Sequence, residues 1–185
     1  AGAALILSHN SISLLFFALA FTFSLVTRKP FIGLLVALLL SATYWLPAVI
    51  ERKYTYGDLF MKEVYLRHFT TLPTFFLPNF SGDPKLITEG IPVQIGFFHV
   101  LALLVTVSLL ARPLARYILL WTSVAIFFMH SASTFAWQAL PLLRQFQFPW
   151  RFLAVSTLTT SLGAGLLAQS KMLRSRVVYV ITIAL

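Results

Sequence analysis

The chain has 185 residues, of which 59% are hydrophobic and only 10% are charged, and its formal net charge is +9. Ordinary soluble domains carry about 25% charged residues, and a chain of this length has too little interior to hide so much apolar surface. These values argue against an ordinary soluble domain. The scatter of Lys and Arg over short loops argues against nucleic acid as a partner, and the absence of Cys excludes a disulfide framework and a Cys-type zinc site.

Long apolar runs recur along the whole chain, and a helix crosses a bilayer with about 20 apolar residues. We therefore predict an all-α fold, a polytopic transmembrane helix bundle with five full spans and the start of a sixth. The predicted spans cover about residues 3–26, 31–50, 94–111, 117–137, 149–169 and 177–185, the last one truncated. The chain begins without Met and ends inside an apolar run, so we expect one transmembrane region that is a fragment of a longer protein.

Charge sorting predicts the orientation of these spans. The short loops 27–30, 112–116 and 169–176 contain Lys and Arg but no acidic residue. All five acidic residues fall in the outer loop, residues 51–93: Glu51, Asp58, Glu63, Asp83 and Glu89. Because basic residues concentrate in short cytoplasmic loops, we place the short basic loops in the cytoplasm and residues 51–94 outside.

The outer loop contains one predicted helix. Asp58 is a favoured N-cap residue, and apolar residues three or four positions apart follow it as far as Phe69. The spacing predicts a short helix that lies along the membrane surface.

The segment from Arg144 to Phe152 is the most distinctive in the chain, because two arginines flank aromatic residues and Pro149 suits a helix start. A helix start beside Arg151 favours an anion, and a phosphate or pyrophosphate headgroup matches a guanidinium. An interfacial Trp and Arg anchor is the alternative interpretation. The substrate-binding candidates are Arg144, Gln147, Trp150, Arg151, His9 and Asn10.

Polar residues also interrupt the apolar runs elsewhere. Ser8-His9-Asn10 lies near the outer end of the first span, where a hydrogen-bonding role and a substrate role are both open. His99 and His130 fit helix packing, and the position of His68 in the outer loop matches no metal-ligand spacing. In the fifth span, Ser156, Thr160, Ala164 and Ala168 recur every four residues beside Gly163 and Gly165, which predicts close helix packing.

The acidic residues do not form a recognisable catalytic set, and no nucleotide-binding, zinc or nucleophile motif is present. Most of them fit a solvated rim. Asp83, which lies in a turn signal with Gly82 and Pro84, is the best catalytic candidate among them if the loop folds over a site. No metal ligand set is predicted within these residues.

Three short motifs carry a resemblance to a known family. They are Leu7-Ser8-His9-Asn10, Leu77-Pro78-Asn79-Phe80 and Gln147-Phe148-Pro149-Trp150-Arg151-Phe152. With them the chain resembles bacterial and archaeal membrane proteins of the 6-pyruvoyl-tetrahydropterin synthase-related domain family, which look like GT-C glycosyltransferases. That resemblance implies a multi-pass protein of the plasma membrane that transfers sugar from a polyprenyl-phosphate carrier on the outer face.

The resemblance also implies where the catalytic group lies. GT-C enzymes normally place an acidic residue in the first outer loop, so we expect the catalytic acid, and any divalent cation, to lie mainly outside these residues. The expected partners are membrane lipids and a lipid-linked sugar donor. A lipid-linked glycan transporter or flippase and a non-catalytic membrane scaffold remain the alternatives, and the oligomeric state is not predicted.

Overall fold

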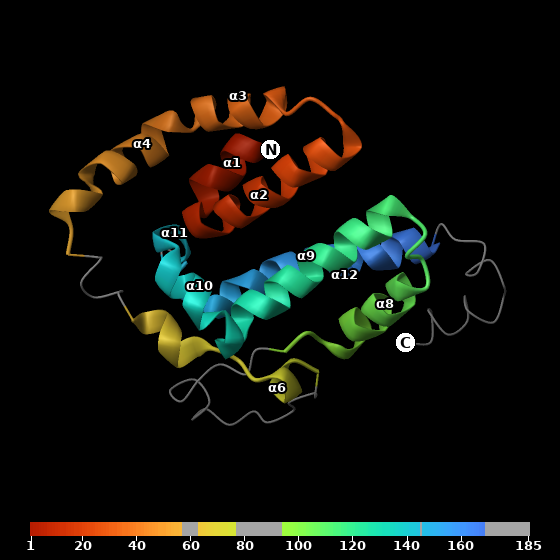
Figure 1. The fold of residues 1–185 in the computed structure, drawn as a ribbon. Coiled ribbons are helices and arrows are strands. Elements are labelled where there is room, and N and C mark those ends of the chain that lie inside the picture. The colour runs from red at the N-terminus through yellow and green to blue at the C-terminus, as the bar shows by residue number, and fades with distance from the viewer. Residues whose placement is uncertain (57–62, 77–93, 145, 169–185) are drawn as a thin grey trace. The chain divides into compact units, whose positions relative to one another are not determined.

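The computed structural model describes residues 1–56, 63–76, 94–144 and 146–168, without the side chains of Asn10 and Ala168. Within these ranges the regular structure is helical and no strand occurs, as an all-α fold requires. The chain divides into two compact units (Figure 1). Unit 1 contains Ala1–Phe69 and His130–Phe152, and unit 2 contains Thr70–Met129 and Leu153–Leu185.

Unit 1 begins with two successive helices that contact each other, where the sequence predicted one continuous span. Helix α1 covers Gly2–Ser8 and α2 covers Asn10–Thr27, and His9 between them has an extended backbone with φ −159° and ψ 99°. The break occurs because the His9 ring accepts a hydrogen bond from the Ile12 N–H at Nδ1, with a donor–acceptor distance of 3.3 Å. His9 is therefore the cap of α2 rather than an interior residue of a continuous helix over 3–26.

The next predicted span is also broken. Helix α3, Ile32–Leu40, packs against α1 and α2, and α4, Ala42–Glu51, follows after Ser41 and leads into the 3-10 turn η1, Arg52–Tyr54. The Ser41 hydroxyl donates to the Ala37 carbonyl (2.8 Å), and the Trp45 indole N–H donates to the Leu38 carbonyl (2.9 Å). These side-chain bonds supplement the backbone hydrogen bonds at the break, where the Ser41 N–H also donates to the Ala37 carbonyl (3.2 Å).

The rest of unit 1 consists of short turns and helices around one tryptophan. They are η2 Val64–His68, η3 Ser131–Ser133, α10 Thr134–Ala139, α11 Pro141–Arg144 and η4 Pro149–Phe152. Trp137 on α10 is fully buried, and Tyr65 on η2 stacks on it with ring centroids 5.1 Å apart. Val64–His68 forms a 3-10 turn, so this part of the predicted surface helix is not α-helical, and its predicted start at Asp58 lies outside the described residues.

Unit 2 is built from four described helices, α6 Leu72–Phe76, α8 Phe97–Val107, α9 Pro113–Met129 and α12 Leu153–Ala168. Helix α12 packs against both α8 and α9. The helix expected over 117–137 ends at Met129, because His130 has an extended backbone and its Nδ1 accepts from the Ala132 N–H (3.1 Å).

Hydroxyl side chains join the helices of unit 2. Thr122 on α9 and Thr159 on α12 have their hydroxyl oxygens 2.7 Å apart, and both residues are fully buried. His99 Nδ1 on α8 lies 2.7 Å from the Thr160 hydroxyl on α12, as its predicted packing role requires. The predicted small-residue stripe is only partly correct, because Ser156 and Thr160 are buried whereas Ala164 is exposed.

None of the described helices is, by itself, both long and apolar enough to cross a bilayer. The pair α3 and Ala42–Tyr54 reaches that length and composition together, with a bend of 70° at the break.

Candidate functional site

Arg151 joins two parts of unit 1 that are far apart in sequence. It lies on η4, which Pro149 begins with a buried ring and no N–H to satisfy. The Arg151 guanidinium is half-buried, and its Nη1 donates to the Ser11 hydroxyl oxygen at 2.9 Å across 140 residues. The predicted anion-binding segment and the polar start of the first apolar run therefore meet, through Ser11 rather than through His9.

Most of the hydrogen-bonding capacity of Arg151 is still open. Of its five N–H groups, one bonds Ser11 and one reaches the Gln147 Oε1 at 3.5 Å, the outer limit for such a bond. Three N–H groups thus have no hydrogen-bond partner among the residues that the structure describes. The guanidinium carbon lies 5.2 Å over the centre of the Phe148 ring, a cation–π contact that fixes its plane.

Acidic residues do not neutralise this guanidinium within the described ranges. Glu51 and Glu63 are the acidic residues that the structure covers, both are exposed, and neither forms an ion pair with Arg151. A half-buried cation without a carboxylate is electrostatically unfavourable unless another anion approaches it.

Gln147 has a strained backbone beside this cation. Its φ is 62°, in the left-handed region that residues other than glycine rarely adopt. The Phe148 N–H donates to the Phe146 carbonyl at 2.6 Å and closes a three-residue turn around Gln147. Strained residues of this kind concentrate at functional sites, and the turn directs the Gln147 amide toward Arg151.

Arg144 has a different role from Arg151. Its Nε donates to the Trp137 carbonyl at 3.2 Å and its Nη2 donates to the Gln138 carbonyl, so the guanidinium satisfies carbonyls near the end of α10. Trp150 is half-buried and stacks on Phe148 with ring centroids 5.5 Å apart. Trp150 thus lies beside Phe148, which Arg151 also contacts, whereas Arg144 donates its hydrogen bonds to carbonyls at the end of α10.

His9 is exposed and uses Nδ1 to cap α2, two residues before Ser11. The backbone of Asn10 begins α2, while its side chain is outside the described part of the chain. Asp83 and the Leu77–Phe80 motif also fall outside it. Among the described residues no group of three His, Cys, Asp or Glu side chains is placed to hold a metal ion.

Sequence reasoning missed two contributors to the site, Ser11 and His68, and gave no separate role to Phe148 inside the predicted motif. Ser11 directly follows His9-Asn10, so a wider window around that motif would have included it. His68 lies against Phe148 with ring centroids 4.9 Å apart, a contact that arises from the packing of η2 on η4. No spacing in the sequence signals that contact.

Comparison with known proteins adds no relative: no family model, no curated protein and no solved structure matches this chain. The family resemblance based on the three short motifs therefore stays a prediction.

Proposed function

We propose that this chain is part of an integral membrane glycosyltransferase of the GT-C type and that Arg151 holds the phosphate of a polyprenyl-phosphate-linked sugar. The observation that carries this proposal is the half-buried Arg151 guanidinium with three uncommitted N–H groups. A tetrahedral oxyanion takes up such N–H groups in pairs, and guanidinium–phosphate bonds are among the stronger hydrogen bonds in proteins.

The position of Arg151 relative to α2 supports an anionic ligand. Ser11, which accepts from Arg151, is the second residue of an 18-residue helix. The start of a helix carries partial positive charge, so a guanidinium placed there is repelled. A bound phosphate would be attracted by both charges and would relieve that repulsion.

The apolar surface of unit 1 supports a membrane location. On α3 and α4 the most exposed large apolar side chains are Leu39 at 75%, Leu40 at 70%, Ile32 at 65%, Val49 at 64% and Ile50 at 58%. Contiguous exposure of this kind is unfavourable in water and is favourable in a lipid environment. Helix α2 also separates Ser11 from the basic pair Arg28 and Lys29 at its other end. We infer an outer donor site and cytoplasmic basic loops in a plasma membrane.

The test compares the two arginines of the segment. We would replace Arg151 by Ala and, as a matched control, Arg144 by Ala, and measure binding of decaprenyl phosphate to each protein in nanodiscs. A hydrogen bond to a charged group contributes about 1.5–3 kcal/mol, so Arg151→Ala should weaken binding by roughly 10- to 100-fold. Arg144→Ala should keep the affinity and lower the thermal stability.

A second measurement separates the enzyme from its rivals. Membranes that contain the protein would receive decaprenyl-phosphate-linked radiolabelled hexoses one at a time, and label would be followed from lipid into the non-lipid fraction. Transfer that Arg151→Ala abolishes supports the enzyme. Binding without transfer would indicate a lipid-linked glycan transporter or a scaffold, and unchanged binding in Arg151→Ala would overturn the assigned role of Arg151.

A further inference from the structure

The Phe148 ring in unit 1 contacts two different functional groups, the cationic guanidinium of Arg151 and the imidazole of His68. Arg151 lies over it at 5.2 Å, and the His68 imidazole meets it edge-to-face with an interplanar angle of 85° and centroids 4.9 Å apart. One aromatic ring therefore brings a guanidinium and an imidazole from distant segments to the same place. No hydrogen bond joins His68 to Arg151, and the shared contact with Phe148 is what links the two groups.

The position of His68 is fixed by its own turn. η2 contains Tyr65, which is buried and stacks on the fully buried Trp137. The next residue after His68, Phe69, also packs edge-to-face on Trp137 with centroids 6.1 Å apart. Tyr65 and Phe69 thus anchor the backbone of the turn on both sides of His68.

His68 differs from the other histidines in its hydrogen bonding. The other three each have Nδ1 engaged: His9 with the Ile12 N–H, His99 with the Thr160 hydroxyl and His130 with the Ala132 N–H. The half-buried His68 ring has no hydrogen-bond partner within residues 1–56, 63–76, 94–144 and 146–168. Both of its nitrogens are thus available to a ligand, and one of them carries a lone pair in the neutral ring.

We propose that His68 is a proton-accepting catalytic residue of the Arg151 site, an inference that rests on the proposed sugar transfer. The acceptor hydroxyl oxygen forms a bond to the anomeric carbon of the donor sugar, and its proton passes to the free nitrogen of His68. The bond between the anomeric carbon and the phosphate oxygen breaks, and the phosphate leaves with the electron pair. The guanidinium of Arg151 stabilises the negative charge that develops on that leaving oxygen.

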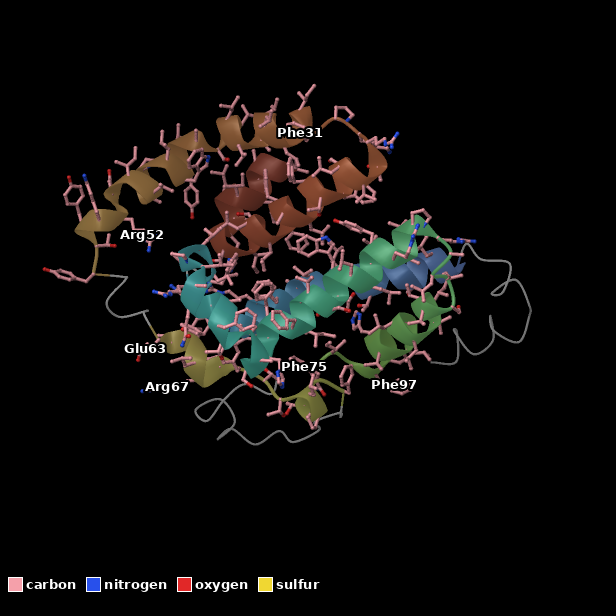
Figure 2. All side chains as sticks on the ribbon, in the orientation of Figure 1. Phe31, Arg52, Glu63, Arg67, Phe75 and Phe97 are labelled. Atoms are coloured by element: carbon pink, nitrogen blue, oxygen red, sulfur yellow. The ribbon has the colours of Figure 1, made fainter. Side chains whose placement is uncertain are left out.

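The charged groups around His68 are few. η4 contributes Arg151, and α10 contributes no titratable residue. On the turn of His68 itself, Arg67 is exposed and Glu63, also exposed, precedes the turn; both side chains project outward (Figure 2). His68 therefore contacts the Phe148 ring, while the charged side chains Glu63 and Arg67 of its own segment are exposed.

The test uses two replacements that separate packing from proton transfer. His68→Phe keeps an aromatic ring against Phe148 and removes both nitrogens, whereas His68→Asn keeps a polar group and removes the base. His99→Asn is the matched control, because it also removes an imidazole and His99 already bonds Thr160. Each protein would be assayed for decaprenyl phosphate binding and for transfer of label from the lipid-linked hexose between pH 5 and pH 9.

General base catalysis contributes about 10²- to 10⁴-fold to a rate. We expect His68→Phe and His68→Asn to bind decaprenyl phosphate as the unchanged protein does and to transfer sugar at least 10²-fold more slowly. If His68 accepts the proton, the transfer rate of the unchanged protein should depend on pH, and both variants should lose that dependence. The donor is a phosphodiester, whose charge is constant over this pH range.

Three results would overturn the inference in distinguishable ways. If His68→Phe keeps the rate and its pH dependence while Arg151→Ala loses donor binding, the phosphate site stands and His68 is a packing residue. If the unchanged protein transfers no sugar, the proposed function fails and the role of His68 fails with it. Loss of donor binding in His68→Phe would show a binding role in place of proton transfer.

Discussion

The two units use polar side chains in opposite ways. In unit 2 the buried hydroxyls bond one another and their own helices: Thr122 and Thr159 lie within hydrogen-bond distance of each other, and each hydroxyl also lies where it can donate to the carbonyl four residues back. In unit 1 Arg151 reaches across the chain to Ser11 and keeps three N–H groups uncommitted within the described residues. Polar groups that satisfy one another stabilise packing, whereas groups left open are available to a ligand.

The packing differs in the same way. Unit 1 is centred on large rings, with Trp137 in contact with Tyr65, Phe69 and Phe152. Unit 2 is centred on small residues, with Gly163 of α12 directly against Thr106 of α8. In unit 1 the packed aromatic rings hold the irregular turns of the candidate site in place. In unit 2 the small residues let neighbouring helices approach closely.

The largest expected effect comes from removing the ring at the centre of unit 1. Trp137→Ala should destabilise the fold by about 3–5 kcal/mol, because it leaves a cavity among buried rings. Trp137→Phe, the control, keeps an aromatic ring and should lose much less. Thermal unfolding in detergent would measure both, and a change below about 1 kcal/mol for Trp137→Ala would contradict the central place of this residue.

The next largest effect tests the close approach in unit 2. A Cβ atom added at Gly163 would collide with the Thr106 hydroxyl, so Gly163→Ala should cost about 1–3 kcal/mol by overpacking. Gly165 is the matched control, since it is exposed and has nothing within 4 Å of an added Cβ. Gly165→Ala should stabilise its helix by about 0.5–1 kcal/mol. Thr106→Ala combined with Gly163→Ala should recover part of the loss.

Composition was enough to predict the helical class but not the helix ends. Where every face of a run is apolar, hydrophobic periodicity does not mark boundaries, so the predicted spans over 3–26 and 31–50 hid the breaks at His9 and Ser41. Each break depends on local side-chain bonds, one from the His9 ring and one from the Ser41 hydroxyl. Such side-chain bonds compete with the helical backbone bonds, and the residue type alone does not predict at which position the helix is interrupted.

The candidate site was predictable in part. The sequence singled out both the Ser8-His9-Asn10 segment and the Arg144–Phe152 segment, and Arg151 bonds Ser11, the residue after Asn10. The two arginines look equivalent in sequence, yet Arg144 follows α10 closely enough to bond its carbonyls. The place of His68 depends on tertiary packing of η2 on η4, for which no local pattern exists.

A third prediction tests whether strain in unit 1 serves the site. Gln147→Gly should stabilise the protein by about 1 kcal/mol, because glycine adopts a φ of 62° without penalty. The same change should weaken decaprenyl phosphate binding, since the amide beside Arg151 is lost. Gln147→Asn, which tolerates this φ and keeps a shorter amide, is the control. A variant that is more stable and binds as before would show that the strain has no role at the site.

The smallest expected effect concerns the hydroxyl pair of unit 2. Thr122→Val keeps the side-chain shape and removes the bonds of this hydroxyl to Thr159 and to the Ile118 carbonyl, while Thr159 retains its bond to the Val155 carbonyl (2.9 Å). An intramolecular hydrogen bond contributes about 0.5–1.5 kcal/mol net, so the single change should cost about that much. The double variant Thr122→Val and Thr159→Val should cost little more, and a double-mutant cycle would measure the coupling. Neither change should alter donor binding. A coupling well above about 2 kcal/mol, or a loss of decaprenyl phosphate binding, would show that unit 2 also holds its polar groups for function, and the contrast with unit 1 would no longer stand.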